Sequence, residues 1–197
     1  MTLKITDKTQ PQLPDHLGGH LNKVHVDFGA LDLIIDQFFI GSMIDIGCGP
    51  GDMVEYAKEQ GLEADGIDGD FTLKYNFPVI LHDFQDDVPP LKRTYDLGYS
   101  TEFLEHVYEG YQANYMAAFT ACKYAVVTYA PPGWEGHHHV CLKPQEYWID
   151  VFDKHGFVYD EETSMEIRKA STMAKGFMGR TGLFFRNRNE PKLPTQG

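Results

Sequence analysis

The chain has 197 residues, of which 42% are hydrophobic and 23% are charged. This length suits one α/β domain with a full hydrophobic core and is short for two domains. The net charge of -12 disfavours a nucleic-acid partner, because binding to phosphates needs clustered Lys and Arg. The chain has no run of about 18 apolar residues and its N-terminus is polar, so we expect neither a membrane-spanning helix nor a signal peptide.

Cysteine usage indicates the compartment. Cys48, Cys122 and Cys141 cannot all pair, and their spacing is unlike that of a zinc site. Cys48 lies in a glycine-rich turn and Cys122 in a helical pattern. Free thiols are typical of a reducing compartment, which predicts a cytoplasmic protein.

Apolar runs alternate with helical patterns along the chain. Residues 1–22 are predicted to form an extended arm, residues 23–190 a single domain and residues 191–197 a tail. The predicted helices cover residues 30–40, 52–61, 109–124 and 144–155. The predicted strands cover residues 42–46, 62–67, 78–81, 95–99, 125–130, 157–159 and 183–188. Strands that alternate with helices indicate a doubly wound, mostly parallel α/β sheet with helices on both faces. The last two predicted strands lack a long helix between them, so one of the two is expected to run antiparallel.

The glycine-rich turn after the first predicted strand is the most informative stretch. Gly47, Gly49 and Gly51 follow an apolar run, and Asp68 ends the next apolar run roughly 20 residues after the turn. A Gly backbone approaches a ligand closely because it has no Cβ. A strand, a Gly-rich turn, a helix and a second strand that ends in an acid suit a nucleoside at the carboxyl edge of a parallel sheet.

The spacing of the turn separates two kinds of nucleoside cofactor. A dinucleotide-binding turn reads G-x-G-x-x-G or G-x-G-x-x-A, whereas here Asp52 stands where the last small residue should be. Asp45 and Asp52 both bring negative charge close to the turn, which would repel a pyrophosphate. The turn therefore favours a cofactor with cationic groups, such as the ammonium and sulfonium of S-adenosylmethionine.

The motif Asp45-x-Gly47-x-Gly49-x-Gly51 resembles D-x-G-x-G-x-G, the first motif of the class I S-adenosylmethionine-dependent methyltransferases. Residues 95–107 are similar to the family's fourth-strand segment, D-L-V-x-S-x-x-x-L-E-H followed by a hydrophobic residue, with Gly98 in place of a β-branched residue. The resemblance covers roughly residues 30–188. It implies a seven-stranded Rossmann-like sheet with the last strand antiparallel, and a reaction that converts S-adenosylmethionine to S-adenosylhomocysteine.

Strand ends and family positions together give a set of cofactor contacts. Asp68 is expected to accept hydrogen bonds from the ribose hydroxyls and Asp83 one from the adenine amino group, with Phe84 against the ring. A cap or turn role is the alternative for Asp83. Ser100 and Glu102 are expected beside the sulfonium and the methionine part. The predicted cofactor set is Asp45, Gly47, Cys48, Gly49, Gly51, Asp68, Gly69, Asp83, Phe84, Ser100 and Glu102.

Three successive histidines follow the fifth predicted strand. Adjacent residues of an extended chain point to opposite sides, so at most His137 and His139 share one ion, and no metal site is predicted. His106, His137 and His139 are candidate proton acceptors because a His pKa lies near neutrality. Structural roles for His106 and for the loop are the alternatives. The candidates for contact with the substrate are Tyr129, Trp134 and His138.

These features predict methyl transfer to an O or N atom of a small-molecule or sugar-like acceptor. A non-catalytic or structural subunit with the same nucleoside pocket is the alternative, and a nicotinamide oxidoreductase is disfavoured by the Gly spacing. A phosphorylated or carboxylated acceptor would suit the basic C-terminal residues Arg168, Lys169, Lys175, Arg180, Arg186 and Arg188, unless these are solvated surface charges. The oligomeric state stays open, since the arm either closes the pocket or exchanges with a neighbour in a homo-oligomer.

Overall fold

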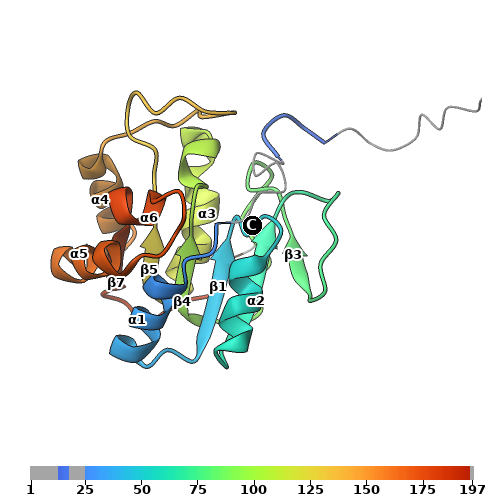
Figure 1. The fold of residues 1–197 in the computed structure, drawn as a ribbon. Coiled ribbons are helices and arrows are strands. Elements are labelled where there is room, and N and C mark those ends of the chain that lie inside the picture. The colour runs from blue at the N-terminus through green and yellow to red at the C-terminus, as the bar shows by residue number, and fades with distance from the viewer. Residues whose placement is uncertain (1–12, 18–24, 196–197) are drawn as a thin grey trace, which may run out of the picture.

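The computed structural model describes residues 13–17 and 25–195, so most of the predicted arm lies outside the described residues (Figure 1). A seven-stranded sheet with the order β3-β2-β1-β4-β5-β7-β6 forms the centre of the molecule. The strands are β1 (Ser42–Ile46), β2 (Glu63–Asp68), β3 (Val79–Leu81), β4 (Tyr95–Ser100), β5 (Cys122–Val127), β6 (Phe157–Tyr159) and β7 (Leu183–Asn187). Strands β1 to β5 pair in parallel, and β7 runs antiparallel to both β5 and β6. The predicted sheet with an antiparallel last strand is therefore confirmed, whereas the limits of a domain at 23–190 stay a prediction.

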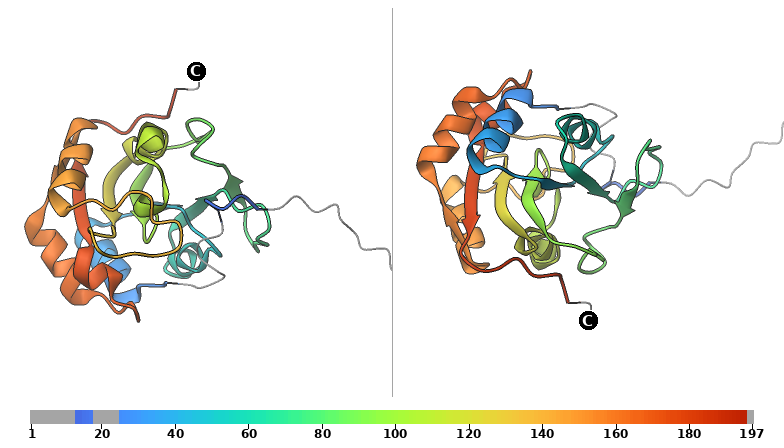
Figure 2. Two further views of the ribbon diagram at one scale, coloured as in Figure 1. Left: turned by 90° about the horizontal axis from the view of Figure 1, so that it is seen from above. Right: turned by 90° about the horizontal axis from the view of Figure 1, so that it is seen from below.

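Helices cover both faces of this sheet (Figure 2). The helical elements are α1 (Phe28–Phe38), α2 (Asp52–Glu59), the 3-10 turns η1 (Leu104–His106) and η2 (Glu109–Tyr111), α3 (Gln112–Thr120), α4 (Gln145–Lys154), α5 (Glu161–Ala170) and α6 (Phe177–Thr181). Buried side chains of α3 and α4 pack on one face, and those of α1, α2, α5 and α6 pack on the other. Within the described residues no helix is long and apolar enough to cross a membrane.

Strand β1 lies at the point where the strand order reverses. It pairs with β2 on one side and with β4 on the other, although β4 follows β3 in the chain. Met43 contributes to one buried cluster while Ile44 and Ile46 contribute to the other, as expected for a central strand that is covered on both faces. In open α/β sheets such a reversal opens a crevice at the carboxyl ends of the two strands, where ligands bind.

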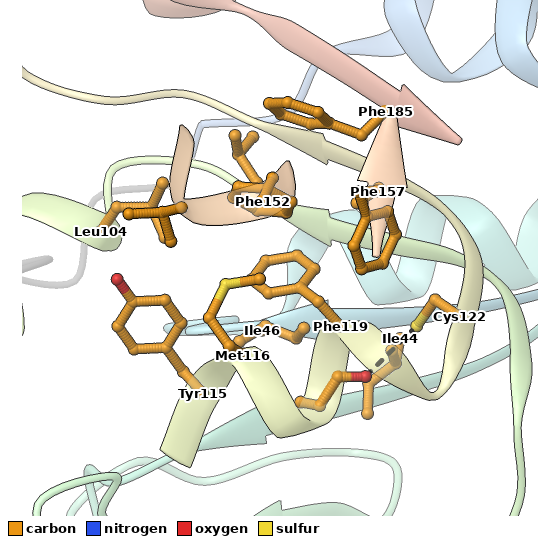
Figure 3. Packing of buried hydrophobic residues seen from close by; sticks show 14 of the residues in the cluster. Ile44, Ile46, Leu104, Tyr115, Met116, Phe119, Cys122, Phe152, Phe157 and Phe185 are labelled. Carbon is orange, nitrogen blue, oxygen red and sulfur yellow. Dashed lines mark hydrogen bonds between the residues drawn. The ribbon is translucent and has the colours of Figure 1, made fainter. Parts of the chain in front are cut away.

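The core beside α4 is built from stacked aromatic rings (Figure 3). Phe152 of α4 stacks on Phe185 of β7 with ring centroids 4.2 Å apart, and it meets Phe119 and Phe157 edge-on. Offset stacked and edge-to-face pairs are the favoured arrangements of aromatic rings. This cluster fixes α4 and the antiparallel strands against the parallel part of the sheet.

The prediction that no long helix lies between the last two strands is wrong, because α5 and α6 fill this connection. The Asp160 side chain caps α5 by accepting a hydrogen bond from the Thr163 N–H at 3.0 Å. The buried face of α5 carries Thr163 and Ser164 beside Ile167. Small polar residues on a buried face weaken the apolar periodicity that identifies a helix in a sequence.

Two local predictions also differ from the structure. Cys122 lies on β5 and not on a helix, since α3 ends at Thr120 and β5 begins three residues before the predicted strand. Asp52 does not cap α2, because Gly51 takes the N-cap position in the left-handed conformation. The three cysteines are buried free thiols.

We expect the substitution Phe152→Ala to lower the free energy of unfolding by about 3–5 kcal/mol, since it removes a fully buried ring and leaves a cavity. Urea unfolding followed by circular dichroism measures this change. Val158→Ala on β6 is the control, because the Val158 side chain is 48% exposed and its loss should change stability by about 0.5 kcal/mol or less. A Phe152→Ala cost as small as that of the control would contradict the packing described here.

Candidate functional site

A cleft of about 260 Å³ opens at the carboxyl ends of the strands around the β1–β4 reversal. Among the residues predicted for the site, those that line the cleft are Asp45, Gly47, Cys48, Gly49, Asp68, Gly69, Asp83, Phe84, Glu102, His106, His137 and His139. The predicted site residues outside its lining are Gly51, Ser100, Tyr129, Trp134 and His138. Residues from four separate strand ends and from the loop after β5 thus meet in one cavity.

Backbone conformation makes glycine necessary in the turn after β1. Gly47 has φ 77° and Gly51 has φ 92°, in the left-handed region that side chains rarely adopt. A Cβ on Gly47 would lie 2.3 Å from the Phe103 ring, and a Cβ on Gly51 would lie 2.4 Å from the Phe77 ring. The turn therefore packs between two aromatic rings at a distance that only glycine permits.

Asp68 is held in place at the end of β2. Its carboxylate accepts hydrogen bonds from the N–H groups of Gly49 and Asp70, each at 2.8 Å. The Tyr75 hydroxyl donates to the Gly49 carbonyl at 2.9 Å and fixes the other side of the turn. The Gly-rich turn and the acid predicted to act with it are thus joined directly.

Asp45 brings a buried carboxyl to the floor of the cleft. Its side chain is 5% exposed, and burial together with the nearby Asp68 carboxylate raises the pKa of Asp45 to about 8. A buried carboxylate is stabilised by a cation, because its own hydration has been lost. The site therefore fits the cationic ammonium of S-adenosylmethionine and not a phosphate group.

Asp83 lines the cleft two residues after β3, and the described N-terminal segment contacts it. One carboxylate oxygen accepts the Gln85 N–H at 2.9 Å, which is a turn contact, and the other lies 2.7 Å from His16 Nε2. Phe84 is buried beside it and meets Phe103 edge-on. His16 and Leu17 line the cleft, so part of the predicted arm lies over the site.

Another part of the cleft lining comes from η1 and from residues 131–144, which we call the post-β5 loop. The Glu105 carbonyl accepts hydrogen bonds from the N–H groups of Val140 at 2.9 Å and Cys141 at 3.0 Å. This pairing brings the His106 and His139 rings together edge-on, with centroids 4.9 Å apart. Burial, with a smaller effect from His139, lowers the pKa of His106 to about 4.

Two acids lie beside these histidines. Burial is the largest cause that raises the pKa of Glu105 well above its usual range, and the neighbouring Glu102 carboxyl raises it further. Burial also raises the pKa of Glu102. Glu102 has φ 53°, a left-handed conformation held by the hydrogen bond from its N–H to Thr128 Oγ1 at 2.9 Å. Such strain in a residue other than glycine is common at functional sites.

The predicted residues outside the lining have other neighbours. The Ser100 hydroxyl donates to the Ile46 carbonyl at 2.7 Å and so joins β4 to β1. The Arg180 guanidinium carbon lies over Trp134, 4.4 Å from the centroid of the Trp134 ring. The His138 and Tyr108 rings meet edge-on, with centroids 5.5 Å apart. Tyr129 is buried in the core beside α4. Their predicted roles in binding stay predictions.

Other lining residues were not singled out from the sequence. Thr101 and Phe103 follow β4, Lys175 comes from the connection between α5 and α6, and Phe177 is the first residue of α6. Lys175 belongs to the basic C-terminal set, which was the available signal, but its position depends on the helix that the sequence pattern did not reveal. Two other members of that set form ion pairs outside the cleft lining, Arg186 with Asp160 and Arg188 with Asp153.

The fold and this site define a nucleoside-dependent α/β enzyme of the methyltransferase type. A family model described as a methyltransferase domain matches residues 29–162. The chain belongs to this family and is an S-adenosylmethionine-dependent methyltransferase, with S-adenosylmethionine as its cofactor. None of the curated proteins matches the chain significantly.

Solved structures share the fold at low sequence identity. The chain is 14% identical to the sugar N-methyltransferase KedS8 from Streptoalloteichus sp., covering 83% of this chain and 86% of that one with a TM-score of 0.60. A TehB-like methyltransferase from Corynebacterium glutamicum is 19% identical, with 82% and 88% covered and a TM-score of 0.57. The 1,6-didemethyltoxoflavin-N1-methyltransferase from Burkholderia thailandensis, with bound S-adenosylhomocysteine, is 11% identical, with 81% and 77% covered and a TM-score of 0.57.

We expect Gly47→Ala to destabilise the protein more than Gly61→Ala. Both positions have a positive φ, at which a Cβ costs about 1–2 kcal/mol, but a Cβ at Gly61 meets no atom within 4 Å. The contact with Phe103 should add about 1–3 kcal/mol for Gly47→Ala. Urea unfolding of both variants measures the difference. An equal loss in the free energy of unfolding would show that the Phe103 ring moves aside without a significant energetic penalty.

Proposed function

We propose that this methyltransferase transfers the methyl group to an O or N atom of a small-molecule or sugar-like acceptor. The observation that carries the cofactor part of this proposal is the row of carboxyl groups in the cleft, where Asp45 lies on β1, Asp68 ends β2 and Asp83 follows β3 by two residues. A row of acids across neighbouring strand ends suits a cofactor that is cationic at one end and hydroxylated at the other.

The proposed orientation of the cofactor follows the strand order. We propose that adenine lies near Asp83 and Phe84, that the ribose hydroxyls donate to Asp68, and that the ammonium lies against Asp45. The methyl group would then point past Glu102 toward the β4 end of the cleft, because β4 is the neighbour of β1 on the side away from β2. The backbone of Gly47, Cys48, Gly49 and Gly69 would border the methionine and ribose parts.

Orientation is the main chemical requirement at that end. The sulfonium already activates the methyl carbon, so the enzyme has to hold an acceptor atom in line with the C–S bond. A hydroxyl or protonated amine acceptor also loses a proton in the reaction. His106, His137 and His139 line this end of the cleft and are the proposed proton acceptors.

The size and charge of the cleft support a small acceptor. Its volume of about 260 Å³ is close to the lower end of the range for small-molecule sites, and the cofactor takes part of this space. Arg93, Lys123, Lys143 and Lys154 are paired with acids on the surface, which weakens any attraction for a phosphate backbone. Lys175 lines the cleft and is available to an acidic group on the acceptor.

We expect cofactor binding to release a proton from Asp45. At about pH 6.5 the carboxyl with a pKa near 8 is mostly protonated, whereas the cofactor's α-amino group is already charged. The bound ammonium lowers the pKa of Asp45, so affinity should rise as the pH rises toward 8. Calorimetry in buffers of different ionisation enthalpy counts the protons, and Asp45→Asn should abolish the release. An unchanged proton count in Asp45→Asn would place the ammonium elsewhere.

We expect turnover with a small hydroxylated or amine acceptor and not with oligonucleotides. S-adenosylhomocysteine formation, measured by mass spectrometry across a library of sugars, phenols, heterocycles and oligonucleotides, tests the acceptor class. A product heavier by one CH₂ group identifies the acceptor, and fragmentation locates the methylated atom. Turnover restricted to oligonucleotides or to proteins would overturn the proposed class.

A further inference from the structure

Three potential metal ligands converge beside the cleft. Glu105, His106 and His139 each offer one ligand atom, and these atoms lie within 4.8 Å of one another. Two of the ligands come from η1 and the third from the post-β5 loop, which the paired hydrogen bonds to the Glu105 carbonyl hold against η1. The cluster thus joins two segments about 30 residues apart in the chain through backbone contacts that do not depend on an ion.

The Glu105 carboxyl has no counterion in the described part of the chain. The residue is 0% exposed, and its carboxyl lies against the Glu102 carboxyl, with no Lys, Arg, hydroxyl or N–H donor hydrogen-bonded to its oxygens in the described residues. Glu102 lies next to it with one buried oxygen that also lacks such a partner. No Lys or Arg within residues 13–17 and 25–195 forms an ion pair with either acid. Buried acids of this kind are paired with a cation or coordinate a metal.

The His139 ring is oriented as a ligand would be. Its Nδ1 lies 2.6 Å from the Trp134 carbonyl, which only accepts hydrogen bonds. The proton therefore sits on Nδ1, and Nε2 keeps its lone pair. A backbone carbonyl that fixes the tautomer of an imidazole in this way is a common partner of metal-ligating histidines.

We infer that Glu105, His106 and His139 bind a divalent first-row transition-metal ion, with Glu102 as an additional carboxylate ligand. Two imidazoles and one or two carboxylates suit Mn²⁺, Fe²⁺, Co²⁺ or Zn²⁺, whereas Mg²⁺ prefers oxygen ligands and bound water. The ligand set differs from the pair His137 and His139 considered from the sequence, because His137 is not part of the cluster found among the described residues.

This site deepens the proposed function and rests on it. Glu102, His106 and His139 line the cleft, so an ion held by these residues would be accessible to an acceptor bound there. A metal ion there would orient an acceptor hydroxyl and ease loss of its proton. With the ion bound, His106 and His139 would act as ligands and not as proton acceptors, so the proton would pass to His137 or to solvent. The oxygen then forms a bond to the methyl carbon while the C–S bond breaks, which leaves the neutral thioether S-adenosylhomocysteine. The preferred acceptor would therefore present an oxygen to the metal.

Metal titrations of the chelator-treated full chain test the site directly. We expect close to one equivalent of Mn²⁺ or Co²⁺ to bind, measured by electron paramagnetic resonance for Mn²⁺ and by elemental analysis after desalting for Co²⁺. Glu105→Gln and His139→Gln should weaken binding by about 100-fold or more, since loss even of a residue that orients a ligand costs about 10–100-fold. His137→Gln is the matched control in the same loop and should retain the wild-type metal affinity.

Cofactor binding in metal-free buffer separates the possible failures. A variant that binds S-adenosylmethionine normally but loses the metal is folded and supports the assignment. Equal loss of metal in His137→Gln and His139→Gln would overturn it, because the ion would then be held by the histidine run. If a variant fails to fold, the metal affinity of the wild-type protein is the test. A Kd weaker than about 1 mM for Mn²⁺, Co²⁺ and Zn²⁺ would overturn the metal site. That result would leave the proposed function intact. The proposed function would be overturned only if no acceptor supported formation of S-adenosylhomocysteine.

Discussion

Buried acid at one edge of the sheet is the constraint on which the rest of the site depends. Asp45 lies in a central strand between β2 and β4, and Glu105 lies in the turn that follows β4. Both side chains are almost removed from water, and no neutralising Lys or Arg is paired with them among the described residues. Carboxyl groups in this position raise the free energy of the empty protein, and they favour cations that enter the cleft. In the proposed binding mode, the ammonium of the cofactor would meet this requirement at Asp45, and the inferred metal ion would meet it at Glu105.

The two ends of the cleft differ in how their side chains are held. At the β2 end, Asp68 is fixed by the turn after β1 through hydrogen bonds to two N–H groups, so the geometry is local to neighbouring strand ends. At the η1 end, a single carbonyl of Glu105 accepts from two successive N–H groups of the post-β5 loop. This arrangement couples the loop that carries His137 and His139 to the turn that carries His106. The η1 end, where we propose that the acceptor binds, is therefore organised by contacts between distant segments.

The N-terminal segment and the α5–α6 connection complete the cleft from opposite directions in the sequence. His16 contacts Asp83, and Lys175 with Phe177 closes another side. These contributions explain why the sequence motifs describe only part of the lining. A sequence motif contains residues that are close along the chain, whereas the lining of a cavity also includes residues from distant segments that the fold brings together.

The sequence by itself determined the parallel sheet, the Gly-rich turn and the acids at successive strand ends. These features follow from local requirements, since apolar runs must be buried and the left-handed φ of Gly47 and Gly51 excludes other residues. The helix α5 escaped prediction because Thr163 and Ser164 occupy its buried face, where their burial depends on partners in β7 and not on hydrophobicity. Only the tertiary structure decided that Glu105, and not His137, joins His106 and His139. The physical reason is that this cluster depends on hydrogen bonds between η1 and the post-β5 loop, and no spacing within either segment specifies them.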